Sequence, residues 1–100
     1  MKHRLIFHPR FFEDIATAQS WIEHARTGWG SRFAAAVEMA VSAIIDYPES
    51  FKIVAGDYRR ALLRKFGYLV VFSCRGEQIR LIGVMHGARD ITSWLESRDL

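Results

Sequence analysis

The residues best placed for chemistry near the C-terminal side of the chain are His86, Arg89 and Asp90, which lie within five positions. The apolar run before them predicts a strand that ends at His86, and Gly87 lets the chain turn directly after it. Loops that follow strands commonly carry function, because a rigid element fixes where their side chains lie. The segment is therefore either a functional site or an ordinary turn in which His86 is hydrogen-bonded and takes part in no reaction.

A second candidate is the basic segment Tyr58–Lys65. In a strand, Arg60 and Arg64 share one face, and Arg59 and Lys65 share the other. Guanidinium groups can hold phosphates or carboxylates through two parallel hydrogen bonds. The same charges also suit an edge strand, where they deter pairing with other sheets. The sequence leaves both roles open.

The charge of the chain is uneven. The 100 residues have a formal net charge of +3, but residues 52–89 contain eight Lys or Arg against two Asp or Glu. Residues 1–51 and residues 90–100 are slightly acidic. A basic middle segment indicates either an anionic partner for one face or a solvated face of a strand.

Signatures of common enzyme classes are absent from the sequence. The chain has no P-loop, no dinucleotide-binding glycine pattern, no GxSxG and no HExxH. His3, His8 and His24 have no Cys or His at metal-ligand spacing, so we expect neither a metal nor a cofactor. The single Cys74 excludes an internal disulfide, and Leu5–Phe7 is too short for a signal peptide or a membrane span. We therefore expect a cytoplasmic protein with no membrane partner.

The first half of the chain has helical periodicity after a short apolar strand, Leu5–Phe7. Two apolar stripes follow, separated by the glycine-containing residues 27–31. The stripes are Phe11, Ile15, Ala18, Ile22 and Ala25, and then Phe33, Val37, Ala40, Val41 and Ile44. They predict an antiparallel helical hairpin that ends before Pro48, because the residue before a proline avoids the helical region.

The second half alternates as strands do. Tyr58–Lys65, Tyr68–Cys74 and Gln78–His86 are separated by short turns and predict an antiparallel meander. On the last strand we expect one face to carry Ile79, Leu81 and Met85, and the other Arg80, Ile82, Val84 and His86. Residues 51–57 predict no regular element, and Asp90 is placed to cap a final helical turn. The order β-α-α-β-β-β predicts one α+β domain over residues 1–100, with a helical hairpin packed on a small antiparallel sheet.

The large aromatic residues Phe12, Trp21, Trp29 and Trp94 fall outside or at the edges of the predicted core stripes. Aromatic residues that a core does not need often anchor interfaces. A small domain can equally use them to extend its core. The sequence alone favours neither role.

Seven segments occur in an order and spacing that are informative together. They are Pro9–Ile15, Tyr47–Glu49, Tyr58–Arg60, Leu62–Leu63, Gly67–Tyr68, Val70–Phe72 and His86–Asp90. This set resembles the RelE/ParE superfamily of toxins from toxin–antitoxin systems, many of whose ParE-like members close the last strand with His-Gly-Arg-Arg-Asp. The resemblance covers nearly the whole chain and implies the same fold as the periodicity predicts.

The resemblance implies a small cytoplasmic toxin of the plasmid stabilisation type, which a cognate antitoxin neutralises. Such antitoxins typically wrap the toxin with an amphipathic helix and an extended segment, so we expect antitoxin-binding roles for Trp21, Trp29 and Trp94. RelE-type members are ribosome-dependent endoribonucleases that cut mRNA. ParE-type members cut no RNA and inhibit DNA gyrase by stabilising its cleaved DNA complex.

The chain departs from the RelE-type nuclease pattern at two places. Such members place an arginine directly after the Gly-Tyr of the hairpin, where this chain has Leu69. They also place a Tyr or His general base in the C-terminal segment, where this chain has Ser93–Leu95. A nuclease would instead have to use His86 as the proton acceptor, with Arg80 and Arg89 stabilising the phosphate.

We therefore expect a non-enzymatic, ParE-like toxin whose partners are its antitoxin and DNA gyrase, a target that comes from the family alone. The expected target-binding residues are Arg59, Arg60, Arg64, Lys65 and Arg89. Two alternatives remain open. One is a RelE-like mRNA interferase with the ribosome and mRNA as partners, and the other is a non-toxic member that only binds its antitoxin.

Overall fold

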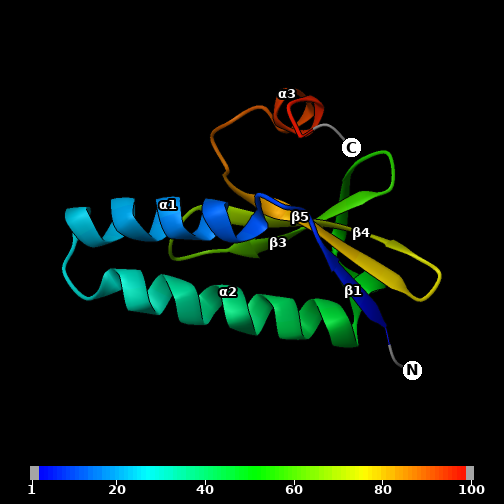
Figure 1. Cartoon of the computed structure of the whole chain (residues 1–100), viewed down its shortest axis with the longest axis horizontal. Helices are drawn as coiled ribbons and strands as arrows, with labels where there is room; N and C mark the ends of the chain where they lie inside the picture. Colours follow the sequence, from blue (N-terminus) through cyan, green and yellow to red (C-terminus); the bar gives the residue numbers. More distant parts are fainter. Residues whose placement is uncertain (1–2, 99–100) are drawn as a thin grey trace.

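The sheet has five strands in the order β1-β5-β4-β3-β2, and the computed structural model describes residues 3–98 of the chain. Strands β2 to β5 pair antiparallel, and β1 adds to β5 in parallel. The elements are β1 (Arg4–Phe7), α1 (Phe11–Ala25), α2 (Trp29–Asp46), the short 3-10 helix η1 (Pro48–Ser50), β2 (Lys52–Ala55), β3 (Tyr58–Leu63), β4 (Tyr68–Arg75), β5 (Gln78–His86) and α3 (Ile91–Glu96). Figure 1 shows α1 and α2 as a hairpin and α3 on the other side of the sheet. The predicted α+β fold is confirmed.

The helical hairpin forms from the apolar stripes that predict it. Its buried apolar residues are Phe11, Ala18, Phe33, Val37 and Ile44, which pack with β3, β4 and β5. Gly30 lets the two helices approach closely, because a Cβ at this position would lie 3.1 Å from the carbonyl oxygen of Gln19. No helix within residues 3–98 combines the length and the apolar character needed to cross a membrane.

The turn between the two helices is fixed by Glu23. Its carboxylate oxygens accept hydrogen bonds from the backbone N–H groups of Gly28 and Gly30, at 2.9 and 2.8 Å. These bonds lower the pKa of Glu23. They also satisfy N–H groups at the start of α2, which has no side-chain N-cap, so a carboxylate of α1 replaces the usual cap.

Residues 51–57 contain β2, so the expectation of an irregular segment is wrong. This strand pairs with the first half of β3, placing Lys52 opposite Arg60 and Ile53 opposite Arg59. Its four residues are exposed or half-buried. They show neither the alternation of polar and apolar residues nor the apolar run from which a strand is predicted. Because β2 forms the edge of the sheet, the first half of β3 is an interior strand. Edge protection therefore does not account for the two arginines of β3.

A β-bulge in β5 reverses the faces expected for its second half. Leu81 and Gly83 pair with adjacent residues of β4, which leaves Ile82 as an extra residue between them. An extra residue shifts the alternation of side chains by one. Buried residues on the hairpin side are Ile79, Leu81 and Val84, and those on the α3 side are Ile82 and Met85. The expected faces of Val84, Met85 and His86 are wrong for this reason.

Helix α3 begins at the predicted cap. The carboxylate of Asp90 accepts hydrogen bonds from the backbone N–H groups of Thr92 and Ser93, at 3.3 and 3.4 Å, and from the Ser93 hydroxyl at 2.8 Å. Bonds to the ionised carboxylate lower its pKa, the Ser93 hydroxyl contributing most. Asp90 therefore ends the loop that follows β5 and starts the helix that covers the second face of the sheet.

Trp94 of α3 belongs to the core. It is 3% exposed and packs with Leu95 against Ile82 and Met85 on the face of the sheet away from the hairpin. Of the two roles that the sequence leaves open for Trp94, the structure shows that it extends the core. A sheet that is apolar on both faces needs a second covering layer, and α3 supplies it with this ring.

Candidate functional site

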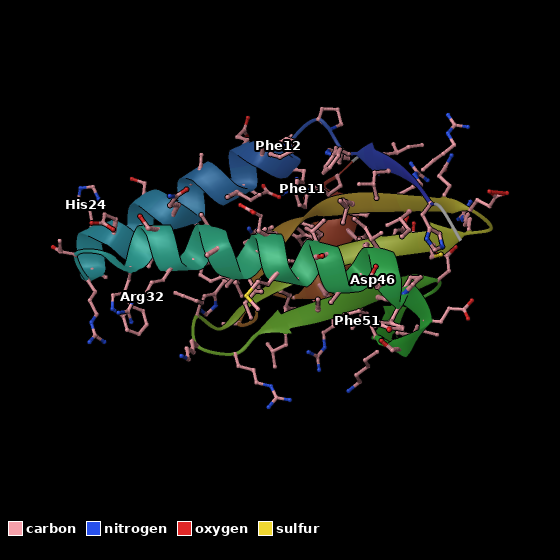
Figure 2. The ribbon with its side chains drawn as sticks, turned by 90° about the horizontal axis from the view of Figure 1, so that it is seen from below. Phe11, Phe12, His24, Arg32, Asp46 and Phe51 are labelled. Atoms are coloured by element: carbon pink, nitrogen blue, oxygen red, sulfur yellow. The ribbon has the colours of Figure 1, made fainter. Side chains whose placement is uncertain are left out.

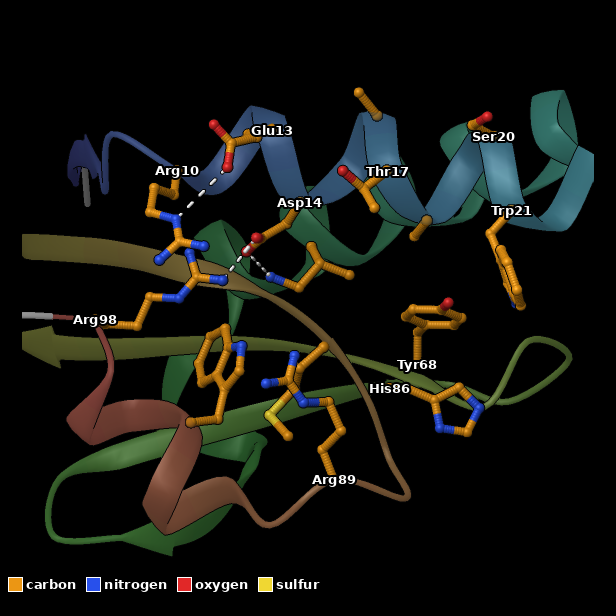
Figure 3. A pocket seen from close by; sticks show the side chains of 15 residues that line it. Arg10, Glu13, Asp14, Thr17, Ser20, Trp21, Tyr68, His86, Arg89 and Arg98 are labelled. Atoms are coloured by element: carbon orange, nitrogen blue, oxygen red, sulfur yellow. Dashed lines mark hydrogen bonds and ion pairs between the residues drawn. The ribbon is translucent and has the colours of Figure 1, made fainter.

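A groove of about 820 Å³ lies between α1 and the end of β5 (Figure 3). It exists because β1 is short and ends at Phe7, opposite Leu81. Within residues 3–98, Ile82–His86 consequently have no strand neighbour on that side, and α1 lies along this part of the sheet. The groove is therefore bounded on one side by α1, and on the other side by the end of β5 and by α3.

Asp14 joins three elements at one end of the groove. Its Oδ2 accepts a hydrogen bond from the backbone N–H of Val84 at 2.9 Å, and its Oδ1 accepts one from Nη2 of Arg98 at 2.6 Å. The side chains of Arg98 and Asp14 are 3% and 10% exposed. Gly83 makes room for this contact, because a Cβ there would meet the Asp14 carboxylate and lie 2.8 Å from the Trp94 ring.

His8 and Trp94 hold the rest of Arg98. The backbone N–H of Arg10 donates to Nδ1 of His8 at 3.1 Å, which places the proton of the neutral ring on Nε2. Nε2 then donates to the carbonyl oxygen of Arg98 at 2.7 Å. The guanidinium carbon lies 4.3 Å from the centre of the Trp94 ring, a cation–π contact. We call His8, Asp14, Trp94 and Arg98 the Arg98 anchor; it ties the end of α3 to the start of α1.

At the other end of the groove, His86 lies edge-on to Tyr68, with ring centres 5.0 Å apart. The backbone N–H of Ala88 donates to Nδ1 of His86 at 3.0 Å. The neutral ring therefore carries its proton on Nε2, and that nitrogen is a hydrogen-bond donor. Burial raises the pKa of Tyr68, which keeps its phenol protonated. This part of the groove offers donors and no free base.

The three residues expected to serve a nuclease do not come together. Arg80 lies between two residues that face the helical hairpin, so its side chain points to the α3 side of the sheet. His86 lies beyond the bulge on the hairpin side, roughly 20 Å along the strand. Only Arg89 lines the groove with His86 (Figure 3). The expectation that Arg80 shares a face with His86 is wrong.

The arginines of β3 are only half-buried, but one of them is bound within the chain. Nη1 of Arg59 donates to the carbonyl oxygens of Phe51, at 2.7 Å, and Glu49, at 3.2 Å. It thus holds the segment between α2 and β2 against the sheet. Arg60 points to the opposite face, as alternation along β3 requires. The two residues do not form a common binding surface.

Four exposed cations gather at one end of the molecule: Arg26, Arg32, Arg64 and Lys65, which we call the cationic end. Trp29 connects them, because its ring packs edge-on against Phe66 of the β3–β4 turn, with centres 5.7 Å apart. The guanidinium carbons of Arg26 and Arg32 lie 4.1 and 5.3 Å from the Trp29 ring centre. Figure 2 shows Arg32 at this end, beside the α1–α2 turn.

The sequence predicts binding roles for Arg64 and Lys65, but it does not indicate Arg26 and Arg32, which lie at the same end of the molecule. Both missed residues belong to the slightly acidic first half of the chain, so the charge count gave them no weight. Their spacing, three positions on either side of Trp29, was the available signal. The two pairs are far apart in the sequence, and the tertiary fold brings them together.

The tryptophans expected at interfaces differ in exposure. Trp21 is 75% exposed at the rim of the groove. Trp29 is half-buried and is contacted by two guanidinium groups and Phe66. Because Trp94 is buried, Trp21 is the one of the three that presents a largely free surface to a partner.

A family model described as the ParE toxin of the type II toxin–antitoxin system parDE matches residues 5–91. No curated protein matches the chain in sequence. The crystal structure of the isolated RelE toxin of E. coli is similar in fold, with a TM-score of 0.62 and 20% identity, covering 98% of this chain and 99% of that chain. A double mutant of E. coli RelE in complex with a peptide of the antitoxin RelBc has a TM-score of 0.54 and 19% identity, covering 97% and 95%.

The structural likenesses show the fold, and the family match extends from β1 to the first residue of α3. The match includes α1 and α2, the sheet apart from Arg4, and the loop that carries Arg89. The chain therefore belongs to the ParE toxin family of type II toxin–antitoxin systems.

Proposed function

We propose that this toxin arrests growth by binding and inhibiting DNA gyrase, without catalysing a reaction of its own. The observation that carries the proposal is the environment of His86, whose Nδ1 accepts the Ala88 N–H while Arg80 lies on the opposite face of the sheet. RNA cleavage by a 2′-hydroxyl needs a proton acceptor and a cation at the same phosphate. An inhibitor that acts by binding needs only a complementary surface.

A supercoiling assay tests the target. Purified toxin is added to gyrase, relaxed plasmid and ATP, and we expect loss of supercoiling with accumulation of cleaved plasmid. Unchanged supercoiling at toxin concentrations that arrest cells would contradict the proposal. Induction of the chain without an antitoxin should stop growth, whereas continued growth would favour a non-toxic member that only binds its antitoxin.

The variant His86→Asn tests the non-catalytic part of the proposal. The Asn side-chain oxygen can still accept the Ala88 N–H, but a carboxamide does not act as a general base or acid near neutral pH. We expect growth arrest and gyrase inhibition to be unchanged. Toeprinting in a translation reaction tests the alternative. If the wild type cleaves mRNA and His86→Asn does not, the target would be the ribosome and not gyrase.

We further propose that the antitoxin covers the groove at Trp21. The support is the exposure of this ring beside a groove, together with the antitoxin peptide bound to the E. coli RelE mutant. Trp21→Ala should weaken the complex with the antitoxin and leave the unfolding free energy nearly unchanged. Met39→Ala is the control, because Met39 on α2 is also 75% exposed. If the two variants bound the antitoxin with equal affinity, the assignment of Trp21 to the antitoxin interface would be contradicted.

A further inference from the structure

The cations of this protein divide into paired and unpaired groups. Within residues 3–98, three ion pairs form, and they involve Arg10, Arg75 and Arg98. Arg59 is held by two backbone carbonyls. The four residues of the cationic end are exposed, and within the same range none of their side chains has an ion-pair or hydrogen-bond partner. Their charge is therefore available to an anionic partner.

Carboxylates do little to neutralise this end. The two segments that form it, residues 26–32 and 64–67, contain no Asp or Glu. Glu23 lies beside the first segment, but both its oxygens are directed onto the N–H groups of Gly28 and Gly30 at the start of α2. Its charge thus meets the positive end of that helix, and four cations remain against one carboxylate.

The form of this end favours phosphates over bases. Trp29 holds Arg26 and Arg32 in place before any partner arrives, which reduces the entropy lost on binding. With two guanidinium groups and Phe66 against it, this ring is not open for a base to stack on. Single strands are bound mainly by stacking on open aromatic rings, whereas a duplex backbone needs only well-placed cations.

We propose that the cationic end binds the phosphate backbone of duplex DNA directly, so that the toxin contacts DNA as well as gyrase. The choice of DNA rests on the proposed function, because gyrase holds a duplex across its surface. The contact is independent of base sequence, since backbone contacts fix position and carry no sequence information. It would place the toxin where the enzyme and its substrate meet.

Binding of the purified toxin to a short fluorescent duplex, measured by anisotropy, tests the proposal without gyrase. Four phosphate contacts predict that the logarithm of the association constant falls with the logarithm of salt concentration with a slope of about −3.6. In Arg64→Glu/Lys65→Glu the affinity should fall about tenfold or more, and the slope should become shallower by about 2. The control Arg4→Glu/Lys52→Glu makes the same change of charge at exposed positions of β1 and β2.

Each outcome separates this inference from the proposed function. Loss of duplex binding in the Arg64/Lys65 variant alone, with thermal unfolding unchanged, supports the inference. Equal losses in both variants would show a general charge effect and overturn it, as would tighter binding of single-stranded RNA than of the duplex. Gyrase inhibition without duplex binding would overturn the proposed DNA contact and be consistent with the proposed function. Duplex binding without gyrase inhibition would support the DNA contact and overturn the proposed function.

Discussion

Arginine has opposite roles in two regions of this protein. In the Arg98 anchor, the guanidinium is 3% exposed, is bound to Asp14 and lies over a tryptophan. At the cationic end, two guanidinium groups also lie over a tryptophan, but they are exposed and no carboxylate pairs with them in the described part of the chain. Both regions therefore use a tryptophan ring to hold arginine. The presence or absence of a paired carboxylate determines whether the guanidinium stabilises the fold or stays available to a partner.

The largest effect is expected for Asp14→Ala, which would break the anchor. The change leaves Arg98 buried without its counter-ion and Val84 without its N–H acceptor. Removal of one partner from a buried ion pair destabilises a protein by about 3–5 kcal/mol. Chemical denaturation followed by fluorescence measures this loss. Glu13→Ala is the matched control, because Glu13 makes an exposed pair with Arg10, and no measurable loss is expected.

Gly83→Ala should have the second largest effect, since it crowds the anchor without removing a charge. A Cβ at this position would meet both the Asp14 carboxylate and the Trp94 ring. Overpacking of this kind costs about 1–3 kcal/mol in the free energy of unfolding. In an Asp14→Ala background the same substitution should cost less, because one of the two obstructions is gone. If Gly83→Ala lowered the unfolding free energy by the same amount in both backgrounds, its strain would not come from contact with the Asp14 carboxylate.

Asp90 gives the anchor a pH dependence through α3. Its hydrogen bonds lower its pKa in the folded protein, so its stabilising contribution is present above the unfolded pKa, near about 3.9, and is lost as pH falls through the folded pKa. Asp90→Ala should therefore reduce the unfolding free energy at neutral pH, with the difference from the wild type shrinking below about pH 4. Asp90→Asn should keep the cap at neutral pH and lose this dependence. Urea unfolding across the pH range compares the three proteins, and a difference that is constant with pH would contradict the assignment.

The smallest effect on stability is expected at the cationic end. Arg64→Ala/Lys65→Ala removes two exposed side chains that make no hydrogen bond or ion pair within residues 3–98, so the unfolding free energy should change by no more than about 0.5 kcal/mol. At low salt the variant should be slightly more stable than the wild type, because repulsion between like charges is reduced, and at high salt the two should agree. A clear destabilisation in thermal unfolding would mean that these residues belong to the fold.

The helices and the antiparallel strands could be predicted from the sequence because each has a periodicity of its own. The stripe that contains Phe33 and Val37 is buried as expected, and Asp90 caps α3 as expected. The bulge at Ile82 could not be predicted, since an extra residue in one strand is defined only against its partner. That single residue changed the face of His86 and separated it from Arg80.

The candidate site was predicted less well than the fold, for a similar reason. Asp14 and Arg98 are 84 positions apart, and nothing local marks either of them as half of a pair. Arg26 and Arg32 are brought near Lys65 by the contact of Trp29 with Phe66. Residue type indicated what these groups can do, but tertiary packing determined which of them act together.

The parallel pairing of β1 with β5 delays the appearance of the finished toxin during its synthesis. Arg4 pairs with Gln78, and His8 bonds to Arg98 from 90 positions away. At about 5–20 residues per second, the ribosome needs roughly 5 to 20 seconds to make the residues between His8 and Arg98. The nascent chain therefore cannot complete its sheet until β5 has been made, or close its anchor until Arg98 has been made. An antitoxin already present in the cell has that interval in which to meet the toxin before it folds.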